Sequence, residues 1–315
     1  MVDLSVKLGD LTLQNPVMPA SGSFSTEYAN VIDLNRLGAM VAKTVSRNFR
    51  AGNPTPRAAE VEGGMINSIG LPTKGLQYFL DVQLPDYKQY TPPLVASISA
   101  EDADDFQAMA RDISAPGVDA IEINISCPTR KPGGGNFALQ AEHTRDIVRR
   151  VCSETDKPVW AKLSPNAGEI VDVALAAEEG GANALTVANT LLAMKINVNS
   201  FRPSLGQKVG GFSGPAIKPI IMRMVYQISK AVTIPVIGCG GICHAEDVIE
   251  YMVAGATAVE IGYINFRNPT AMISIIKDLE IWCDKRGIKR ISDLTGAVRD
   301  DDMETDTFAA AAQGL

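Results

Sequence analysis

The sequence predicts an α/β fold in which eight parallel strands close into a (β/α)8 TIM barrel. Eight short apolar runs recur along the chain, and helical patterns with apolar residues three to four positions apart lie between several of them. The runs are rich in valine and isoleucine without strict alternation, which is typical of parallel strands buried on both faces. Strands that alternate with helices imply right-handed crossovers, and eight repeats favour a closed barrel over a doubly wound sheet.

The expected elements follow from these patterns by position. The expected strands are residues 16–20, 39–43, 94–97, 120–124, 159–163, 184–188, 236–239 and 258–261. The expected helices are residues 102–113, 144–153, 170–179, 217–231, 245–253 and 269–285. The carboxyl ends of the strands are expected to converge on one mouth of the barrel, where the active sites of such folds lie.

Three stretches do not belong to a minimal barrel. Residues 4–8 and 11–13, joined at Gly9-Asp10, are expected to form an N-terminal β-hairpin that caps the bottom of the barrel. Residues 46–90 and 189–213 are long loops after the second and sixth strands, so we expect binding loops or lids at the C-terminal face. We therefore expect one domain over residues 1–299 and a flexible tail, acidic and then alanine-rich, over residues 300–315.

Composition excludes several classes of function. The formal net charge of −7 argues against a nucleic-acid surface, which needs clustered lysine and arginine. The sequence has no apolar run long enough for a membrane span and no secretion signal at its start, so a cytoplasmic location is expected. The five cysteines are scattered, as free thiols in a reducing compartment would be. Cys239, Cys243 and His244 have no fourth ligand nearby, so no metal site is expected.

Polar residues and glycines gather at the strand ends. They are Ser21, Gly22, Lys43, Thr44, Ser97, Ser99, Asn124, Ser126, Cys127, Lys162, Asn189, Thr190, Gly240, Gly241, Gly262 and Tyr263. A lysine inside an apolar strand is costly to bury unless it is paired, so Lys43 and Lys162 favour ligand contact over a structural ion pair. The asparagines are equally compatible with turn capping. The glycines after strands seven and eight favour close approach of backbone amides to a phosphate over plain turns.

Cys127 is the candidate for acid–base chemistry. A free cysteine is most often a small buried hydrophobe. Here it lies just past a strand end, before Pro128 and a basic, glycine-rich segment over residues 130–135. This position is more typical of a movable loop that reaches solvent than of a core. The chain has only two histidines, so histidine-based catalysis has little support.

Five motifs carry a resemblance to a known family. They are Asn15-Pro16-Val17 with Ala20-Ser21-Gly22, residues 67–71 (NSIGL), residues 124–128 (NISCP), residues 162–166 (KLSPN) and residues 210–219 (GGFSGPAIKP). In this order they resemble the class 1 dihydroorotate dehydrogenases, from about Leu4 to Arg299. The segment 211–226 and the opening hairpin look most like the class 1B, NAD-linked catalytic subunit. Cys127 also places the chain in class 1, since class 2 enzymes carry serine there.

The resemblance implies an FMN-bearing barrel that oxidises dihydroorotate to orotate in pyrimidine biosynthesis. By resemblance, the FMN contacts are Ser21, Lys43, Thr44, Ser97, Asn124, Lys162, Val187, Gly214, Gly240, Gly241, Gly262 and Tyr263. The substrate contacts are Lys43, Asn67, Ser68, Ile69, Gly70, Leu71, Asn124, Asn189 and Thr190. The catalytic residues are Cys127, which matches the base, and Lys162.

The chemistry of these residue types agrees with such a reaction. Asparagine side chains offer a donor and an acceptor in one plane, so Asn67, Asn124 and Asn189 can match the amide rim of a pyrimidine ring. Lys43 can meet a ring carboxylate. Cys127 can take the proton while the flavin takes the hydride, and Lys162 can stabilise negative charge on the reduced flavin. A free thiol has a pKa of about 8.5, so turnover is expected to rise from neutral to alkaline pH.

Two departures leave alternatives open. The family usually has asparagine where this chain has Thr73 and Thr129. The alternatives are a fumarate-linked class 1A homodimer, a relative acting on uracil-type rings, and a flavin or phosphate-sugar barrel that has no use for Cys127. A class 1B enzyme needs a second subunit with FAD and a [2Fe–2S] cluster, because this chain has neither a four-cysteine cluster nor a glycine-rich dinucleotide fingerprint. The expected partners are therefore dihydroorotate or orotate, a second copy of the chain, and possibly that subunit.

Overall fold

The computed structural model describes residues 2–126 and 137–299. Cys127 and Thr129, which fall in residues 127–136, and the predicted tail over residues 300–315 lie outside the described residues. An eight-stranded parallel sheet forms the centre, in the order β3, β16, β15, β10, β9, β8, β7, β4. Its strands are β3 (Val17–Pro19), β4 (Met40–Val41), β7 (Leu94–Ile98), β8 (Ala120–Asn124), β9 (Val159–Lys162), β10 (Ala184–Val187), β15 (Val236–Gly238) and β16 (Ala258–Ile261). All eight predicted strands are confirmed.

The sheet closes almost completely into a barrel. Its two outer strands, β3 and β4, are joined by a hydrogen bond of 2.8 Å from the backbone amide of Gly38 to the carbonyl of Val17. A Cβ atom at Gly38 would lie 2.1 Å from the carbonyl oxygen of Asn15, so only glycine allows this close approach. The predicted (β/α)8 architecture is thereby confirmed.

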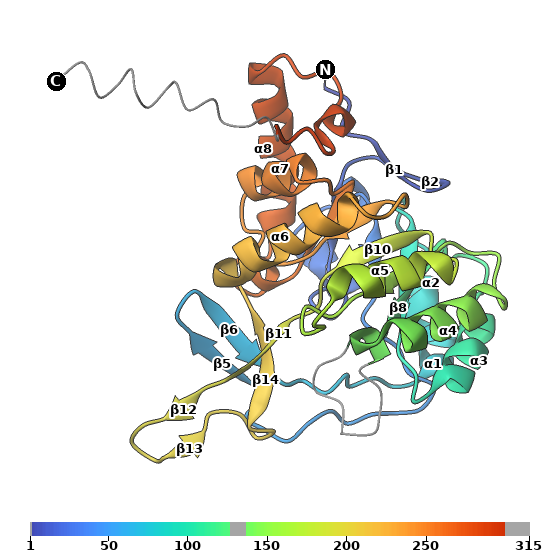
Figure 1. Ribbon diagram of the computed structural model, residues 1–315, viewed down its shortest axis with the longest axis vertical. Helices are drawn as coiled ribbons and strands as arrows, with labels where there is room; N and C mark the ends of the chain where they lie inside the picture. The colour runs from blue at the N-terminus through green and yellow to red at the C-terminus, as the bar shows by residue number, and fades with distance from the viewer. Residues whose placement is uncertain (1, 127–136, 300–315) are drawn as a thin grey trace.

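Helices cover the outside of the barrel (Figure 1). The longer ones are α3 (Ala103–Ile113), α4 (Ala141–Cys152), α5 (Ile170–Glu179), α6 (Lys218–Ser229), α7 (Ala245–Val253) and α8 (Ala271–Lys285). Each matches a predicted helix to within three residues at either end. Each buries one apolar stripe on the sheet, as in α3, where Phe106, Met109, Ala110 and Ile113 are buried. Short helical turns complete the connections: η1 (Thr26–Asn30), η2 (Leu34–Arg36), η4 (Phe137–Leu139), η5 (Pro215–Ile217), η6 (Tyr263–Phe266) and η7 (Ile291–Leu294).

The segment over residues 46–90, predicted as a long loop, contains regular structure. It begins with the hairpin β5 (Ala58–Val61) and β6 (Gly64–Asn67). A continuous helical stretch follows, made of α1 (Leu76–Tyr78), the π-helical turn η3 (Phe79–Gln83) and α2 (Leu84–Tyr87). The proline of α2 lacks a backbone N–H and lies in the interior of this stretch, directly after the π-helical turn, where the hydrogen-bond pattern of the helix changes. This stretch supplies the helix between β4 and β7 that the sequence pattern did not indicate.

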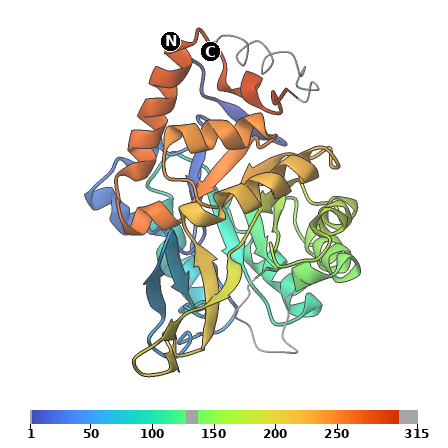
Figure 2. The ribbon, with the colours of Figure 1, turned by 60° about the vertical axis from the view of Figure 1, so that its left-hand side comes forward.

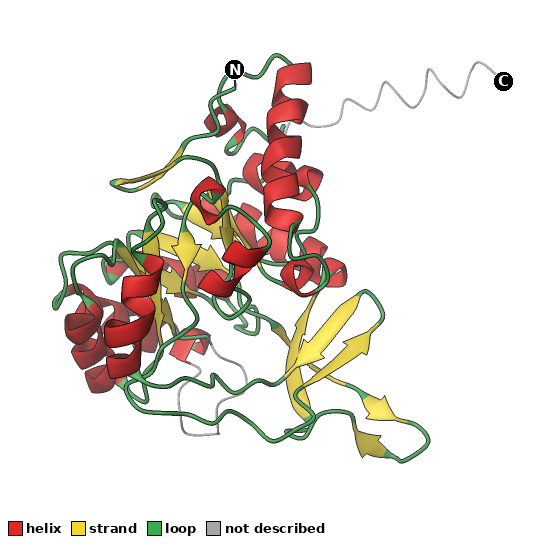
Figure 3. Ribbon diagram, turned by 180° about the vertical axis from the view of Figure 1, so that it is seen from behind, coloured by secondary structure: helices red, strands yellow, loops and turns green. Residues whose placement is uncertain are grey.

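The two long segments join into one antiparallel sheet. Its order is β11 (Leu191–Met194), β14 (Val209–Ser213), β6, β5, and Gly211 lies opposite Asn67 in the register. A second small hairpin, β12 (Ile196–Asn197) and β13 (Arg202–Pro203), extends from it. Figures 1 and 3 show this sheet projecting from one end of the barrel. The expected position at one barrel face is therefore right, but strands replace irregular loops.

The N-terminal hairpin consists of β1 (Val6–Leu8) and β2 (Leu11–Leu13), as predicted. Leu8 and Leu13 are fully buried, so the hairpin belongs to the core. Figures 1 and 2 place it at the end of the barrel away from the antiparallel sheet. No helix among the described residues is long and apolar enough to cross a membrane.

Candidate active site

A cavity of about 390 Å³ lies at the carboxyl ends of the barrel strands and beneath the antiparallel sheet. Its volume is within the range of small-molecule and cofactor sites. Most of the residues that the sequence predicted for the site line it: Ser21, Lys43, Thr44, Asn67, Ile69, Gly70, Leu71, Asn124, Lys162, Asn189, Thr190, Gly240, Gly241, Gly262 and Tyr263. They come from segments spread over more than 200 residues of sequence, so the barrel topology is what brings them together.

Among the described residues, four predicted contacts of the cofactor or substrate are not part of this lining. Ser68 is buried, and its hydroxyl accepts a hydrogen bond of 2.8 Å from the Asn53 side chain. Ser97 and Val187 are fully buried in their strands, and Gly214 follows Ser213, which does line the cavity. Ser97 touches the site through Thr44, since the two hydroxyl oxygens are 3.0 Å apart.

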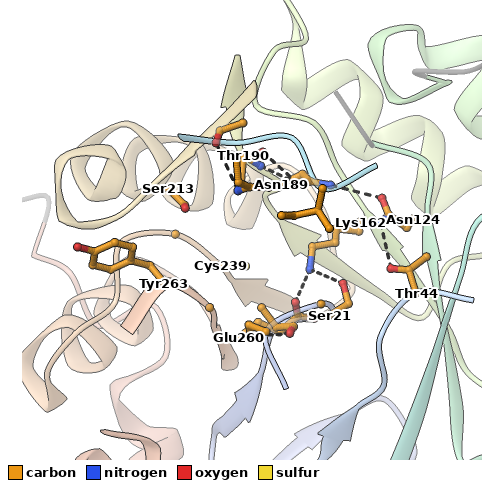
Figure 4. A pocket seen from close by; sticks show the side chains of 18 of the residues that line it. Ser21, Thr44, Asn124, Lys162, Asn189, Thr190, Ser213, Cys239, Glu260 and Tyr263 are labelled. Atoms are coloured by element: carbon orange, nitrogen blue, oxygen red, sulfur yellow. Dashed lines mark hydrogen bonds and ion pairs between the residues drawn. The ribbon is translucent and has the colours of Figure 1, made fainter. Parts of the chain in front are cut away.

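Two asparagines hold each other at the cavity wall (Figure 4). The Asn189 amide nitrogen donates to the Asn124 oxygen at 3.4 Å and to the Ser126 hydroxyl at 3.0 Å. The Asn124 amide nitrogen donates to the Thr44 hydroxyl at 3.2 Å. These contacts fix the orientation of both amide planes before any ligand binds, which reduces the ordering cost of recognition.

Lys43 presents an unbalanced positive charge to the cavity. Its side chain is half-buried, and no residue in ranges 2–126 and 137–299 forms a hydrogen bond or ion pair with its ammonium group. Burial, and then the charge of Arg57, lower the pKa of Lys43. An unpaired ammonium in this position is suited to an anionic group on a ligand.

Lys162, in contrast to Lys43, forms ion pairs with two carboxyl groups. Its ammonium nitrogen lies 2.5 Å from Glu260 Oε2, 3.4 Å from Glu122 Oε2 and 3.3 Å from the Ser21 hydroxyl. Burial alone would lower the pKa of Lys162, but the charges of Glu122 and Glu260 raise it. The sequence favoured ligand contact over an ion pair for this lysine. The structure shows that it lines the cavity and is also paired, because a charge this deeply buried needs a counter-ion.

Sequence reasoning missed three residues here. Glu122 and Glu260 sit in the middle of apolar strands β8 and β16, and both are fully buried. Like the two lysines, each is a charged residue within an apolar run, but neither stands at a strand end, where the functional side chains were predicted. Cys239, for which the sequence predicted no role beyond a free thiol, also lines the cavity directly after β15.

The remaining walls fit a flat aromatic group that bears a phosphate. Apolar side chains, including Met65, Ile217, Ile242 and Phe266, line much of the surface. Gly240, Gly241 and Gly262 follow the last two strands at one side. Gly241 has a φ of +72°, and a Cβ there would lie 2.8 Å from Lys218 Cβ, so the turn requires glycine. Backbone amides in such turns can approach phosphate oxygens closely, which is the arrangement that FMN needs.

Comparison with known proteins identifies the family of the chain. Residues 3–282 match the family model described as dihydroorotate dehydrogenase. A protein of a Geobacillus species named "Dihydroorotate dehydrogenase B (NAD(+)), catalytic subunit" is 47% identical over 296 residues, covering 93% of this chain and 95% of the relative. Proteins of the same name from Bacillus cereus and Bacillus anthracis are each 46% identical over 296 residues, covering 93% of this chain and 96% of theirs. The resemblance drawn from the motifs is thus confirmed, and the chain belongs to the dihydroorotate dehydrogenase family of oxidoreductases.

Proposed function

We propose that this protein is the catalytic subunit of an NAD-linked dihydroorotate dehydrogenase, which oxidises dihydroorotate to orotate in pyrimidine biosynthesis. The observation that carries the proposal is the cavity itself. It combines two oriented asparagine amides, a lysine that has no partner within residues 2–126 and 137–299, and a buried second lysine within about 390 Å³. The names of the relatives support the same assignment.

Different residues would bind the pyrimidine ring, its carboxylate and the cofactor. Asn67, Asn124 and Asn189 would hold the amide rim of the pyrimidine ring, and Lys43 would meet its carboxylate. FMN, when bound, supplies the acceptor for the hydride. Ser21, Lys162 and the glycines at 240, 241 and 262 would hold it. Cys127, which lies outside the described residues, is proposed as the base that takes the proton.

A partner subunit follows from the NAD-linked assignment. The described residues contain no group of metal-ligating side chains that could hold a cluster, and Cys152, Cys239, Cys243 and Cys283 are free thiols. We therefore propose that FAD and a [2Fe–2S] cluster reside on a second, electron-transfer subunit. We further propose a homodimer of this chain and a cytoplasmic location.

The charge of Lys43 favours dihydroorotate over a uracil-type ring. Uracil has no carboxylate, so it would leave the half-buried ammonium unpaired. Thr73, one of the two departures from the family pattern, uses its hydroxyl to accept a hydrogen bond of 3.1 Å from the amide of Gly75. It lines a neighbouring cavity instead of this one, so it does not alter the walls described here.

Anaerobic reduction tests the assignment directly. The purified protein is expected to carry a flavin spectrum that dihydroorotate bleaches and dihydrouracil does not. Lys43→Met should keep the flavin spectrum but require much more dihydroorotate for bleaching. A colourless protein that takes up no FMN, or bleaching by dihydrouracil alone, would overturn the proposal. Co-purification with a second subunit that contains iron would support the NAD-linked assembly over a fumarate-linked homodimer.

A further inference from the structure

Two buried carboxyl groups share one ammonium group at the floor of the cavity. Glu122 on β8 and Glu260 on β16 are both fully buried. Each contacts Lys162 on β9, at 3.4 Å and 2.5 Å respectively. The Thr186 hydroxyl on β10 also lies between them, 3.3 Å from Glu122 and 3.2 Å from Glu260. The cluster therefore has one positive charge to balance two potential negative charges.

The cluster is most stable when it holds one proton. An uncompensated charge that is buried costs several kcal/mol in a protein interior. Burial, and then the charge of Glu122, raise the pKa of Glu260 to about 8. Burial would also raise the pKa of Glu122, but the charge of Lys162 lowers it. Lys162 nevertheless lies nearer to Glu260 than to Glu122, which favours charge on Glu260. We therefore assign the proton to the pair and not to either residue.

Hydroxyl groups connect this pair to the cavity wall. The Ser97 hydroxyl on β7 donates to Glu122 Oε1 at 2.9 Å. It is also 3.0 Å from the Thr44 hydroxyl, and Thr44 lines the cavity. Glu260 is itself part of the lining. A proton on the pair can therefore exchange with the cavity along these groups, although both carboxyl groups are buried.

We propose that Glu122 and Glu260 form a proton-sharing pair that positions the ammonium group of Lys162 and sets the electric charge at the floor of the cavity that would hold the cofactor. They are positioning residues, since they act through Lys162. Above the pH at which the pair loses its proton, the cluster carries one negative charge. A hydride entering the cavity then adds a further negative charge, and the pair takes up one proton from solvent to offset it. Reoxidation returns that proton.

Two other titratable groups of the described chain interact most strongly with the pair. They are Lys162 and the Cys239 thiol on the loop after β15. Ser21, Ser97 and Thr186 contact the cluster with neutral hydroxyls. A pH dependence near 8 can therefore be assigned to the pair by substituting only two residues.

The first test needs no cofactor, so it is independent of the proposed function. Infrared spectra of the apoprotein, recorded from pH 6 to pH 10, should contain the C=O stretch of a buried protonated carboxyl group that disappears above about pH 8. The band should be absent in Glu122→Gln and in Glu260→Gln, because the one remaining carboxyl group pairs with Lys162 and ionises. Glu250→Gln is the matched control, since Glu250 pairs with Lys218 at 2.8 Å outside the cavity and should leave the band unchanged. Absence of the band in the wild-type protein would overturn the proposal.

The second test uses the protein loaded with FMN and rests on the proposed function. Above pH 8, the wild type should take up more protons during anaerobic reduction than either single glutamine variant. The difference should be up to one proton per cofactor reduced. The double glutamine variant leaves Lys162 without a counter-ion. The uncompensated positive charge should stabilise the reduced cofactor by at least tenfold, which raises its reduction potential by about 30 mV for two electrons. Equal proton uptake in wild type and Glu260→Gln, or an unchanged potential in the double variant, would contradict the proposal. If the wild-type protein shows the infrared band but binds no FMN, the result contradicts the proposed function and leaves the proton-sharing pair in place.

Discussion

At the scale of single residues, the two lysines of the cavity show how environment decides role. Lys43 is half-buried without a partner in the described chain, whereas Lys162 is buried and contacts two carboxyl groups. The charge of Lys162 is already balanced by the protein. That of Lys43 is available to an anion that arrives with a ligand. The two lysines are therefore suited to different tasks in the proposed function: Lys43 to binding of the substrate carboxylate, and Lys162 to control of charge at the cofactor.

Removal of the Lys43 charge should weaken binding of orotate. Lys43→Met is expected to raise the dissociation constant by roughly tenfold to a hundredfold, since a hydrogen bond to a charged group contributes about 1.5–3 kcal/mol. Burial lowers the pKa of Lys43, so the ammonium group loses its charge at a lower pH than an exposed lysine does. The affinity of the wild type for orotate should therefore fall as the pH rises through the pKa of Lys43, whereas the affinity of the variant should not. Flavin spectral titration measures both. Lys74→Met is the control, as that ammonium is exposed, contacts Tyr78 and lies outside this cavity. Equal affinity in Lys43→Met and wild type would argue against carboxylate binding by Lys43.

Substitution of Cys127 should remove the base. Cys127→Ala is expected to lower kcat by about 10²- to 10⁴-fold, the usual contribution of a general base. The wild-type rate should rise from neutral pH toward the ordinary thiol pKa of about 8.5. Steady-state kinetics across pH 6–9.5 measure both effects. Cys152→Ala is the control, because Cys152 ends α4 and lies outside the lining of the cavity. Its thiol donates to the Gly181 carbonyl. A flat pH profile, or full activity in Cys127→Ala, would remove the base assignment.

At the scale of elements, the strands and helices that could be predicted are those with a regular spacing of apolar residues in the sequence. The eight barrel strands and six helices were found because buried parallel strands and amphipathic helices leave regular apolar patterns. The antiparallel sheet was not found, because its central strand β14 contains Gly210 and Gly211 and pairs with β6, far away in the sequence. Glycine has low strand propensity, and a pairing partner at that distance leaves no local pattern.

The same reasoning applies to the candidate site. Strand-end residues such as Asn124 and Gly241 could be predicted, because parallel strands share one carboxyl edge. Glu122 and Glu260 were visible as charges within apolar strands, but their common partner depends on which strands are neighbours across the barrel. β9 and β16 are separated by β10 and β15 in the sheet, so only barrel curvature brings Glu260 to Lys162.

Gly211 links the antiparallel sheet to the proposed substrate contacts. A Cβ atom there would lie 1.9 Å from the Thr190 hydroxyl, and Thr190 lines the cavity. Gly211→Ala is therefore expected to displace Thr190 and raise KM for dihydroorotate about tenfold or more, with a smaller effect on kcat. Steady-state kinetics with the melting temperature recorded in parallel measure this. Gly168→Ala is the control, because a Cβ at Gly168 meets no atom within 4 Å. If both variants kept the wild-type KM, the close contact would have no role in binding.

At the scale of the whole molecule, the strand and hairpin that follow β10 expose an apolar surface. Residues 192, 194, 196 and 198 alternate along the chain, and all four side chains are exposed hydrophobics. Phe201, at the tip of the hairpin, is 86% exposed. We call these five residues the hairpin patch: Leu192, Met194, Ile196, Val198 and Phe201. Figures 1 and 3 show this hairpin projecting from the body of the molecule. Several large exposed apolar side chains close together in the sequence are typical of a protein–protein interface, and this is where we expect the proposed homodimer to form.

Polar substitution in the hairpin patch should therefore separate the two copies. The double variant Ile196→Ser with Phe201→Ser is expected to shift the mass of the protein from dimer to monomer in size-exclusion chromatography with light scattering. The substitutions lie outside the lining of the cavity, so the flavin content per chain should stay unchanged. Val31→Ser is the matched control, since Val31 is also an exposed hydrophobic residue but lies outside the patch, and it should leave the dimer intact. A dimer that survives the double variant would place the interface on another surface, and a wild-type monomer in the absence of other subunits would leave the hairpin patch for a different partner.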